Sequence, residues 1–501
     1  MNKLELPLIS LLLLALPARA AWLATTTWDV QASSCSDNNG GGFDTASAGI
    51  DRSTATSPQV NINNSAVTAT VNASVITFTG STYTVLAGDV GNNVHIITST
   101  GGTAPTAGWY RIISVSAGLN GTWTLDHTTA AVTSTLTSAL MGGCLATIGG
   151  AMTAQAAATV DMTTYVKTGT YNLTSTITTT TNSSGVFNSR VAGYQTTHGD
   201  VPTGTNRPLI STNGNGIVAF TLSAGQGWHL DNLRIDGTAG GGTAGTQGVL
   251  ITQNHFALFN TKISNFSAEC VSLNGSYTAQ ILASEITGCG GTKGAIYSQS
   301  FLQVLWSWVH DNFKTGIYLT DSGQQSQIRW SVISNNTGAA TVHGIATLGT
   351  TTIENNVIYG NQGDGVHYTQ NPSYYESTNM HNIYAKNTGF AINSTVTQGN
   401  SKPLTFNYNA TWSNNSNSIV QANQYQNFGA GVNDINLSAD PFTQDGSNNF
   451  TLISTGAGAL LRAAGFNALA LNGLTGTSYP DIGVLQHQDA AASGSISAIV
   501  Q

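Results

Sequence analysis

Charged side chains are scarce in this sequence. Lysine and arginine together number 15 and aspartate and glutamate 23, so 8% of the 501 residues are charged, against roughly 25% in an average globular domain. The surfaces of helical proteins usually carry many Glu–Lys pairs, and this sequence has too few charged residues for them, so a helical enzyme is disfavoured. Fifteen scattered basic residues also provide no concentrated positive surface, which speaks against a nucleic-acid partner. Uncharged polar partners such as glycans fit this composition better.

Long apolar runs are lacking beyond the N-terminus, and no later stretch is a candidate for a membrane span. Residues 1–20 carry Lys3, an apolar run from Leu6 to Pro17, and the tripeptide Ala-Arg-Ala. A helix that spans a bilayer needs about 20 apolar residues, and this run is shorter. The segment therefore predicts a cleaved signal peptide and a secreted or cell-surface protein.

Only four cysteines are present, and none of their spacings is CxxC, so zinc or redox chemistry is not indicated. In an oxidising compartment an even number of cysteines indicates disulfides. Four cysteines allow three pairings. Proximity in the sequence favours Cys270 with Cys289, which leaves Cys35 with Cys144.

What the sequence does contain is a repeat of twenty-odd residues. Short runs with alternating apolar residues begin at Gly248, Cys270, Gly294, Gly316, Gly344, Gly365 and Gly389. Alternation of this kind predicts strands. A unit of about 22 residues without a helix cannot bury its apolar face alone, so successive units must coil and stack. We therefore expect an all-β fold, a parallel β-solenoid.

The second half of each unit repeats more strictly, as in Ile353-Glu354-Asn355-Asn356-Val357-Ile358-Tyr359-Gly360-Asn361. Apolar residues at its first and sixth places predict stacked core rows. The fourth place holds Thr261, Ser284, Ser307, Ser331, Asn356 and Asn409, and the ninth holds Asn312, Asn336, Asn361 and Asn414. We expect these side chains to hydrogen-bond to one another along the stack, and asparagine to supply the left-handed conformation of tight bends.

This pattern resembles the right-handed parallel β-helix proteins of the pectate-lyase-like superfamily, over about Gly150 to Asn414. The resemblance implies the fold and leaves the activity open, because the superfamily includes polysaccharide lyases and hydrolases, phage tailspikes and adhesins. The Ala-rich stretch Met152 to Val160 and the strand ending in Tyr171 resemble the capping helix and first strand of that superfamily.

Four regions are expected on this basis: the signal peptide at 1–20, a small β-rich subdomain at 21–148, the β-helix at 149–430 and a closing segment at 431–501. Strand-like runs at Val67 to Thr79 and Trp109 to Val115 support the β-rich subdomain. Its role cannot be read from the sequence.

In the superfamily, substrate lies along the outer face of the first sheet. The outward row is expected to read Leu250, Ser272, Ile296, Tyr318, Ala346, His367 and Ala391. Neighbouring loops add His343, Asp321 and Asp364, and the loop from Thr369 to Ser377 carries Tyr374, Tyr375 and Glu376. These tyrosines suit sugar binding, because a ring stacks on the apolar face of a pyranose.

The candidate catalytic residues are Tyr318, His367, His343, Asp364 and Asp321, and they allow two chemistries. A lyase needs a base to remove the proton next to a uronate carboxylate, a role for His343 or His367 with Tyr318. A hydrolase needs two carboxylates, such as Asp321 with Asp364 or Glu376. The paired aspartates, Gly-His and Arg-x-Lys of polygalacturonases are not intact, because residues 234–236 read Arg-Ile-Asp.

Two further groups have a functional and a structural interpretation. Asp37, Asn39 and Asp44 offer the oxygen ligands that Ca²⁺ prefers, although Gly-rich turns look alike. Trp306 and Trp330 occupy the same place on adjacent coils, where they could pack against each other or form a sugar platform.

Two classes of function remain. The first is an exported polysaccharide lyase or glycoside hydrolase that acts along the groove. The second is a non-catalytic, adhesin-like or structural β-solenoid that binds glycan. A phage tailspike is a weaker third, because virion parts need no signal peptide. The oligomeric state is not readable from the sequence.

Overall fold

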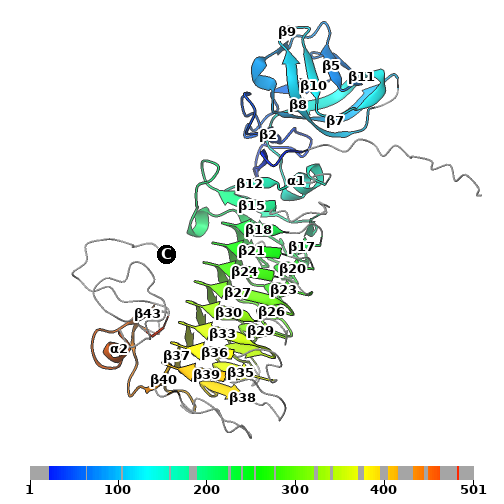
Figure 1. Cartoon of the computed structure of the whole chain (residues 1–501). Helices are drawn as coiled ribbons and strands as arrows, with labels where there is room; N and C mark the ends of the chain where they lie inside the picture. Colours follow the sequence, from blue (N-terminus) through cyan, green and yellow to red (C-terminus); the bar gives the residue numbers. More distant parts are fainter. Residues whose placement is uncertain are drawn as a thin grey trace, which may run out of the picture. The chain divides into compact units, whose positions relative to one another are not determined.

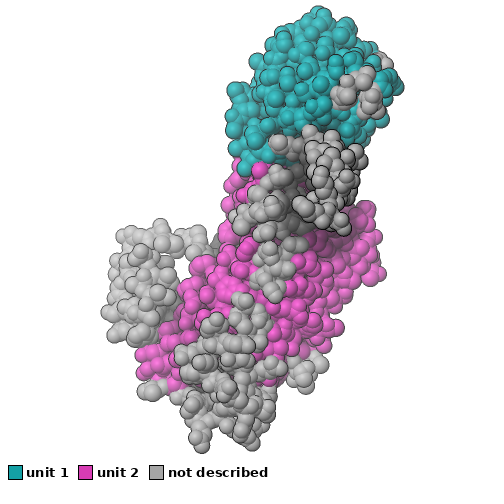
Figure 2. Space-filling model, turned by 45° about the vertical axis from the view of Figure 1, so that its right-hand side comes forward, with its two compact units in different colours: residues 1–26, 38–143 teal, residues 27–37, 144–501 magenta. Residues whose placement is uncertain are grey.

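The structure is a computed structural model. It describes residues 22–63, 65–102, 105–156, 160–179, 189–223, 227–238, 241–252, 255–275, 278–320, 325–338, 342–369, 377–394, 404–415, 431, 433–444, 449–462 and 482–483. The chain divides into two compact units, residues 1–26 with 38–143 and residues 27–37 with 144–501 (Figure 2). The predicted signal peptide lies outside the described residues. Neither described helix has the length and apolar character that crossing a bilayer requires.

The first unit is a small antiparallel β-barrel. Its barrel strands are β3 (Val60–Ile62), β4 (Ala69–Ala73), β5 (Val75–Phe78), β7 (Asn93–Thr100), β8 (Gly108–Ser116), β10 (Thr122–Leu125) and β11 (Ala130–Met141). The unit also contains β2 (Gly42–Asp44) and a separate pair, β6 (Thr84–Val85) with β9 (Gly118–Leu119). The long strand β11 pairs with β3, β4 and β7, which closes the order β11-β4-β5-β10-β8-β7 into a ring. Trp123 and Phe78 fill the interior with their rings edge to face. The predicted N-terminal β subdomain is confirmed.

The second unit is a solenoid in which each coil contributes one strand to each of three parallel sheets (Figure 1). The first sheet contains β14 (Ile177–Thr178), β17 (Phe220–Leu222), β20 (Val249–Ile251), β23 (Val271–Leu273), β26 (Ile296–Ser298), β29 (Ile317–Leu319), β32 (Ile345–Thr347), β35 (Val366–Tyr368) and β38 (Ile392–Ser394). The second sheet contains β1 (Thr26–Val30), β12 (Thr163–Lys167), β15 (Ser189–Tyr194), β18 (Trp228–Asp231), β21 (His255–Phe259), β24 (Thr278–Leu282), β27 (Phe301–Leu305), β30 (Ser326–Arg329), β33 (Thr351–Glu354), β36 (Ser377–Met380) and β39 (Leu404–Asn407). The third sheet contains β13 (Thr170–Asn172), β16 (Leu209–Ser211), β19 (Arg234–Asp236), β22 (Lys262–Ser264), β25 (Glu285–Thr287), β28 (Trp308–His310), β31 (Val332–Ser334), β34 (Val357–Tyr359), β37 (Ile383–Ala385), β40 (Ala410–Trp412) and β41 (Ile435–Asn436).

The core of the solenoid is made of stacked aliphatic rows, as the repeat predicts. In the second sheet Ile281, Val304, Ile328 and Ile353 are in register, and all four are fully buried. The sixth places form a matching row in the third sheet. Because each coil covers the apolar face of the next, the short strands are stable only as a stack.

Two columns of small polar side chains run inside the turns, again as predicted. The fourth-place column reads Thr261, Ser284, Ser307, Ser331, Asn356, Asn382 and Asn409; in each step a backbone N–H donates to the side-chain oxygen of the next coil. The ninth-place column reads Asn312, Asn336, Asn361, Asn387 and Asn414, and its side-chain amides also donate to one another. These bonds satisfy polar groups that have no access to water.

The left-handed residues of these bends are not the column asparagines themselves. Positive φ falls one residue earlier, at the third place, as in Trp306 (51°), Trp330 (49°) and Asn355 (57°), and at the eighth place, as in Asn335 (52°). The expectation that the column asparagines adopt this conformation was therefore wrong. The bend leads the chain from one sheet to the next, and the side chain of the residue that follows it is buried.

Helix α1 (Ile148–Ala154) lies near the start of the main segment of the second unit. It begins four residues before Met152, where the sequence predicted the capping helix to begin. The Asp37 carboxylate accepts hydrogen bonds from the amides of Ala146 and Thr147 and from the Thr147 hydroxyl at its N-terminus. At the other end, β42 (Phe442–Gln444), β43 (Asn449–Leu452) and α2 (Gly456–Leu461) pack on the outer face of the third sheet, against Tyr359. The C-terminal elements thus cover the outer face of the last strands of the third sheet.

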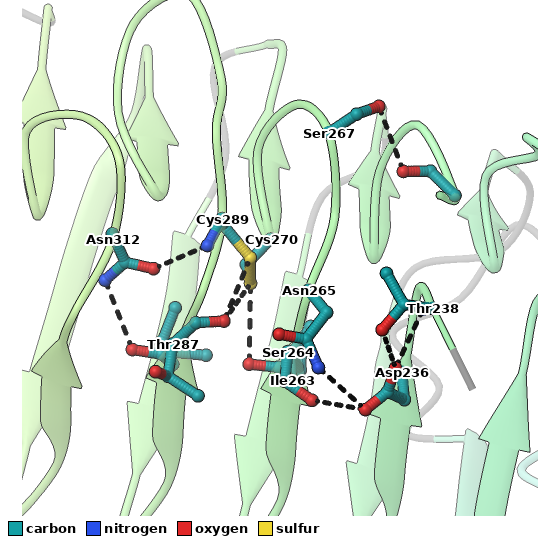
Figure 3. Close-up of a disulfide and its surroundings, with 12 residues drawn as sticks. Asp236, Thr238, Ile263, Ser264, Asn265, Ser267, Cys270, Thr287, Cys289 and Asn312 are labelled. Atoms are coloured by element: carbon teal, nitrogen blue, oxygen red, sulfur yellow. Dashed lines mark hydrogen bonds between the residues drawn. A yellow bond between two sulfur atoms is a disulfide. The ribbon is translucent and has the colours of Figure 1, made fainter. Parts of the chain in front are cut away.

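The four cysteines form the favoured pairs, Cys35 with Cys144 and Cys270 with Cys289. Figure 3 shows the second pair inside a coil, where the Cys289 amide donates to the Asn312 side chain. Cys289 thus takes the ninth place, ahead of the asparagine column. In later coils the ninth-place asparagine lies against a glycine; a Cβ on Gly316 would come within 2.8 Å of the Asn336 amide nitrogen. Cys270 and Cys289 occupy the positions that this glycine and asparagine hold in later coils, which are close enough for a disulfide.

Candidate functional site

Three ionisable side chains from consecutive coils meet at the outer face of the first sheet. His367 lies on β35, Asp364 in the turn before it, and His343 in the turn before β32. The Nδ1 atom of His367 is 2.6 Å from Oδ2 of Asp364, and Nδ1 of His343 is 3.4 Å from the same oxygen. The two imidazole rings stack with centroids 4.3 Å apart. Three of the five predicted catalytic residues are therefore brought together.

Asp364 is held by the next coil. Its Oδ1 atom accepts from the Phe390 amide at 2.8 Å, and Oδ2 accepts from the Asn393 side chain at 2.9 Å. Burial works against the ionised carboxyl, but the hydrogen bonds from His367, Phe390 and Asn393 outweigh it and lower its pKa. A Cβ on Gly389 would come within 2.4 Å of Oδ1, so a glycine is needed there to leave room for the carboxylate.

The hydrogen bonds assign different roles to the two histidines. His343 accepts the Asp364 backbone N–H through Nδ1 at 3.1 Å, which requires a lone pair on that atom. Burial and the neighbouring His367 lower the pKa of His343 to about 4, so it is neutral at pH 7. His367 donates from Nδ1 to a carboxylate, which places the lone pair of its neutral form on Nε2. His367 is therefore the imidazole arranged to accept a proton.

The same three side chains could also hold a metal ion, because their ligand atoms lie within 4.8 Å of one another. Two histidines and a carboxylate are a common donor set for Zn²⁺ and Fe²⁺. Binding through the Nδ1 atoms would, however, displace the Asp364 N–H from His343 and the proton between His367 and Asp364. The hydrogen-bond pattern therefore fits a proton-transfer site better.

The outward row of the first sheet differs from the expected one at two positions. Tyr297, not Ile296, pairs with Tyr318, and Asn393, not Ala391, pairs with His367. Both predictions were wrong because the small residue before the strand is an alanine in these coils, at Ala295 and Ala391, and the preceding glycine was counted instead. The corrected row reads Leu250, Ser272, Tyr297, Tyr318, Ala346, His367 and Asn393.

Tyr318 and Tyr297 lie two and three coils from His367, respectively, and have ring centroids 6.0 Å apart. The Nζ atom of Lys293 is 3.8 Å from the centroid of the Tyr297 ring. Partial burial would raise the pKa of Tyr297, but hydrogen bonds from Lys293 and Thr320 lower it overall. The sequence analysis did not identify Lys293 or Tyr297 as site residues. Counting two positions from Ala295, the small residue before the strand, would have identified Tyr297.

The remaining predicted residues divide into two groups. Asp321, Tyr374, Tyr375 and Glu376 lie outside the described residues. Of the expected Ca²⁺ ligands, Asp37 belongs to the second unit, where it binds the start of α1; Asn39 and Asp44 belong to the first, where Asp44 forms an ion pair of 3.1 Å with Arg111. Ca²⁺ binding there stays a prediction.

Comparisons with known proteins bear on the fold. Residues 215–380 match the family model described as "Right handed beta helix region". No curated protein matches the sequence.

Solved structures similar to this chain all share low identity with it. A pectate lyase, Pel9A, is 16% identical, with a TM-score of 0.41 over 69% of this chain and 92% of that chain. ORF18 of Geobacillus virus E2 is 15% identical, with a TM-score of 0.36 over 55% and 53%. The periplasmic alginate epimerase AlgG is 12% identical, with a TM-score of 0.31 over 55% and 75%.

The family match and the three parallel sheets agree with the predicted resemblance. The second unit of this chain is a right-handed parallel β-helix.

Proposed function

We propose that the chain binds a polysaccharide along the outer face of the first sheet and that His367 removes a proton from the bound sugar. The observation that carries this proposal is the 2.6 Å hydrogen bond between His367 and Asp364. An imidazole oriented by a buried carboxylate is the usual arrangement of a general base. Two disulfides support export, because they persist in oxidising compartments.

The chemistry that suits a single base is β-elimination at a uronate. Nε2 of His367 would accept the proton on the carbon next to the carboxylate, and the electrons of that C–H bond would form a C=C bond. The glycosidic C–O bond on the adjacent carbon would break, and the leaving oxygen would take a proton from solvent. Lys293 lies about three coils away, roughly 14 Å, so it would contact another sugar unit of the same chain.

Hydrolysis is the less supported alternative. It needs a second carboxylate roughly 5 to 9.5 Å from the first. The cluster contains one carboxylate among the residues that the structure describes, Asp364. The other predicted acids, Asp321 and Glu376, lie outside that part of the chain. Proton removal by His367 therefore agrees better than hydrolysis with the hydrogen bonds that His367, Phe390 and Asn393 make to Asp364.

Product analysis on a panel of polysaccharides tests the proposal. The panel should contain polygalacturonate and alginate as acidic chains and a glucan and a mannan as neutral ones. We expect ultraviolet absorbance from unsaturated ends to rise together with reducing ends on an acidic chain. Reducing ends without absorbance would identify a hydrolase and refute the base mechanism.

A non-catalytic glycan-binding protein is the second candidate. Tyr318 favours it, because its half-buried ring on the outward row offers stacking surface without chemistry. Binding of a polysaccharide with no product on any member of the panel would establish this function and exclude turnover.

A further inference from the structure

Two tryptophans stack on a different surface of the β-helix, at the turn between the second and third sheets. Trp306 follows β27, and Trp330 follows β30 on the next coil. Their ring centroids are 5.2 Å apart and their planes differ by 8°. Trp306 remains 41% exposed. The predicted packing of the two rings is confirmed, and one face of Trp306 remains open; the sugar platform stays a prediction.

The backbone at both tryptophans adopts a conformation that bulky residues avoid. Their φ angles are 51° and 49°, in the left-handed region. Other coils place Asn232, Asn260 and Asn355 at this position, and asparagine tolerates it far better. Strain of this kind is retained where the side chain has a use.

The open side of the stack faces a small residue. Register pairs Leu282 with Leu305, so Ala283 stands next to Trp306 on the side away from Trp330. One face of the Trp306 indole stacks on Trp330. On the opposite side the equivalent position of the neighbouring coil carries only the methyl group of Ala283. Phe259, one coil further, is also 41% exposed.

The groups beside the open indole carry little net charge. On the open side Glu285, two residues after Ala283, forms an ion pair of 2.7 Å with Lys262, and on the covered side Arg329 and Glu354 form one of 3.1 Å beside Trp330. The second sheet also presents a line of amides, Gln280, Gln303 and Gln327, which bond to one another along the stack. An apolar ring face next to amide donors and acceptors suits a ligand with an apolar face and a rim of hydroxyls, without charge.

We propose that the open face of Trp306 is a second carbohydrate-binding site, which takes a neutral pyranose unit of a glycan chain. The sugar would stack on the indole above Ala283, and its hydroxyl groups would reach the glutamine line. The first-sheet site is not required for this binding. The second site would hold the protein on a polysaccharide while the first sheet engages the same or another chain.

Equilibrium binding on the full chain tests this proposal with Trp306→Asn, because asparagine is the residue that other coils use at this position. Phe313→Ala is the matched control; Phe313 is a 60% exposed aromatic of the same β-helix. The probes are hexamers of β-1,4-glucose and β-1,4-mannose, with hexagalacturonate as the charged comparison. Calorimetry gives the affinity, and the shift of tryptophan fluorescence reports the site.

We expect a neutral hexamer to bind with a fluorescence shift, about tenfold more weakly to Trp306→Asn and equally well to Phe313→Ala and His367→Ala. Equal affinity of Trp306→Asn, or no binding of either neutral hexamer, would overturn the proposal. So would a change of sedimentation in Trp306→Asn, which would assign the surface to contact between copies of the chain. Unchanged thermal unfolding of Trp306→Asn separates lost binding from lost fold.

Discussion

Two columns of side chains run along the same coils of the β-helix and behave in opposite ways. The ninth-place column repeats one residue from Asn312 to Asn414, and its members are buried and hydrogen-bonded to one another. The outward row of the first sheet has no single repeated residue: two tyrosines, Tyr297 and Tyr318, are followed by Ala346 and then His367.

The difference separates structural from functional positions. A repeated polar residue satisfies its neighbours and leaves nothing for a ligand. The coils stack with different residues in the outward row, so stacking does not require any one of them. A hydrogen-bonded pair such as His367 with Asp364 in this row therefore indicates a function. Substitutions in the two columns should therefore change different measurements.

The largest effect is expected at His367. Replacement by alanine removes the proposed base and should lower kcat/KM on the responsive polysaccharide about 10²–10⁴-fold, with little change in thermal unfolding. His255→Ala, at an exposed position on β21, is the control. Full activity of His367→Ala would refute the assignment of the base.

Next comes Asn361→Ala in the buried column. It would remove the oxygen that accepts from the backbone and side-chain N–H groups of Asn336, and the amide that donates to the Asn387 side chain and the Ile333 carbonyl. We expect a loss of about 4 kcal/mol in the free energy of unfolding, measured by denaturant titration. The exposed Asn274→Ala should cost less than about 0.5 kcal/mol. Equal losses would show that the column has no special role in stability.

A slightly smaller effect is expected for the disulfide that begins the same column. Replacement of Cys270 and Cys289 by alanine opens a loop with a sequence separation of 19 residues. Loop-closure entropy predicts a loss of about 3 kcal/mol. Chemical denaturation under oxidising conditions measures it. If reduction destabilised the double variant as much as the native protein, the loss could not be assigned to this bond.

The smallest effect concerns His381, which holds the third-place position where other coils have asparagine. Burial lowers its pKa to about 4, below the value of about 6.5 in unfolded chains. The unfolded state therefore binds more protons between pH 6.5 and 4, and stability falls as the pH falls through this range. His381→Asn should remove about 1–2 kcal/mol of that loss, allowing for solvent screening. Unfolding curves at pH 7 and 4.5 test this; identical pH dependence would contradict it.

Much of the fold could be predicted because it repeats. The aliphatic rows and the polar columns follow from aligning coils of similar length, and the disulfide pairs follow from the proximity of Cys270 and Cys289 in the sequence. The errors in the outward row arose in two coils, where the small residue before the strand is Ala295 or Ala391 and not a glycine. Ile296 was exchanged for Tyr297 because side chains alternate between the two faces of a strand, so a shift of one residue exchanges inside and outside.

The sequence by itself determined the coil, its core and its turns, since each depends on spacings that recur within about 25 residues. Tertiary structure decided which rare residues meet. His343, Asp364 and Asn393 come from three coils separated by unequal insertions, and their contacts depend on hydrogen bonds between turns. The open face of Trp306 likewise depends on a neighbour, Ala283, one coil away. A repeat fixes the rows, and the contacts across them depend on the local path of each turn.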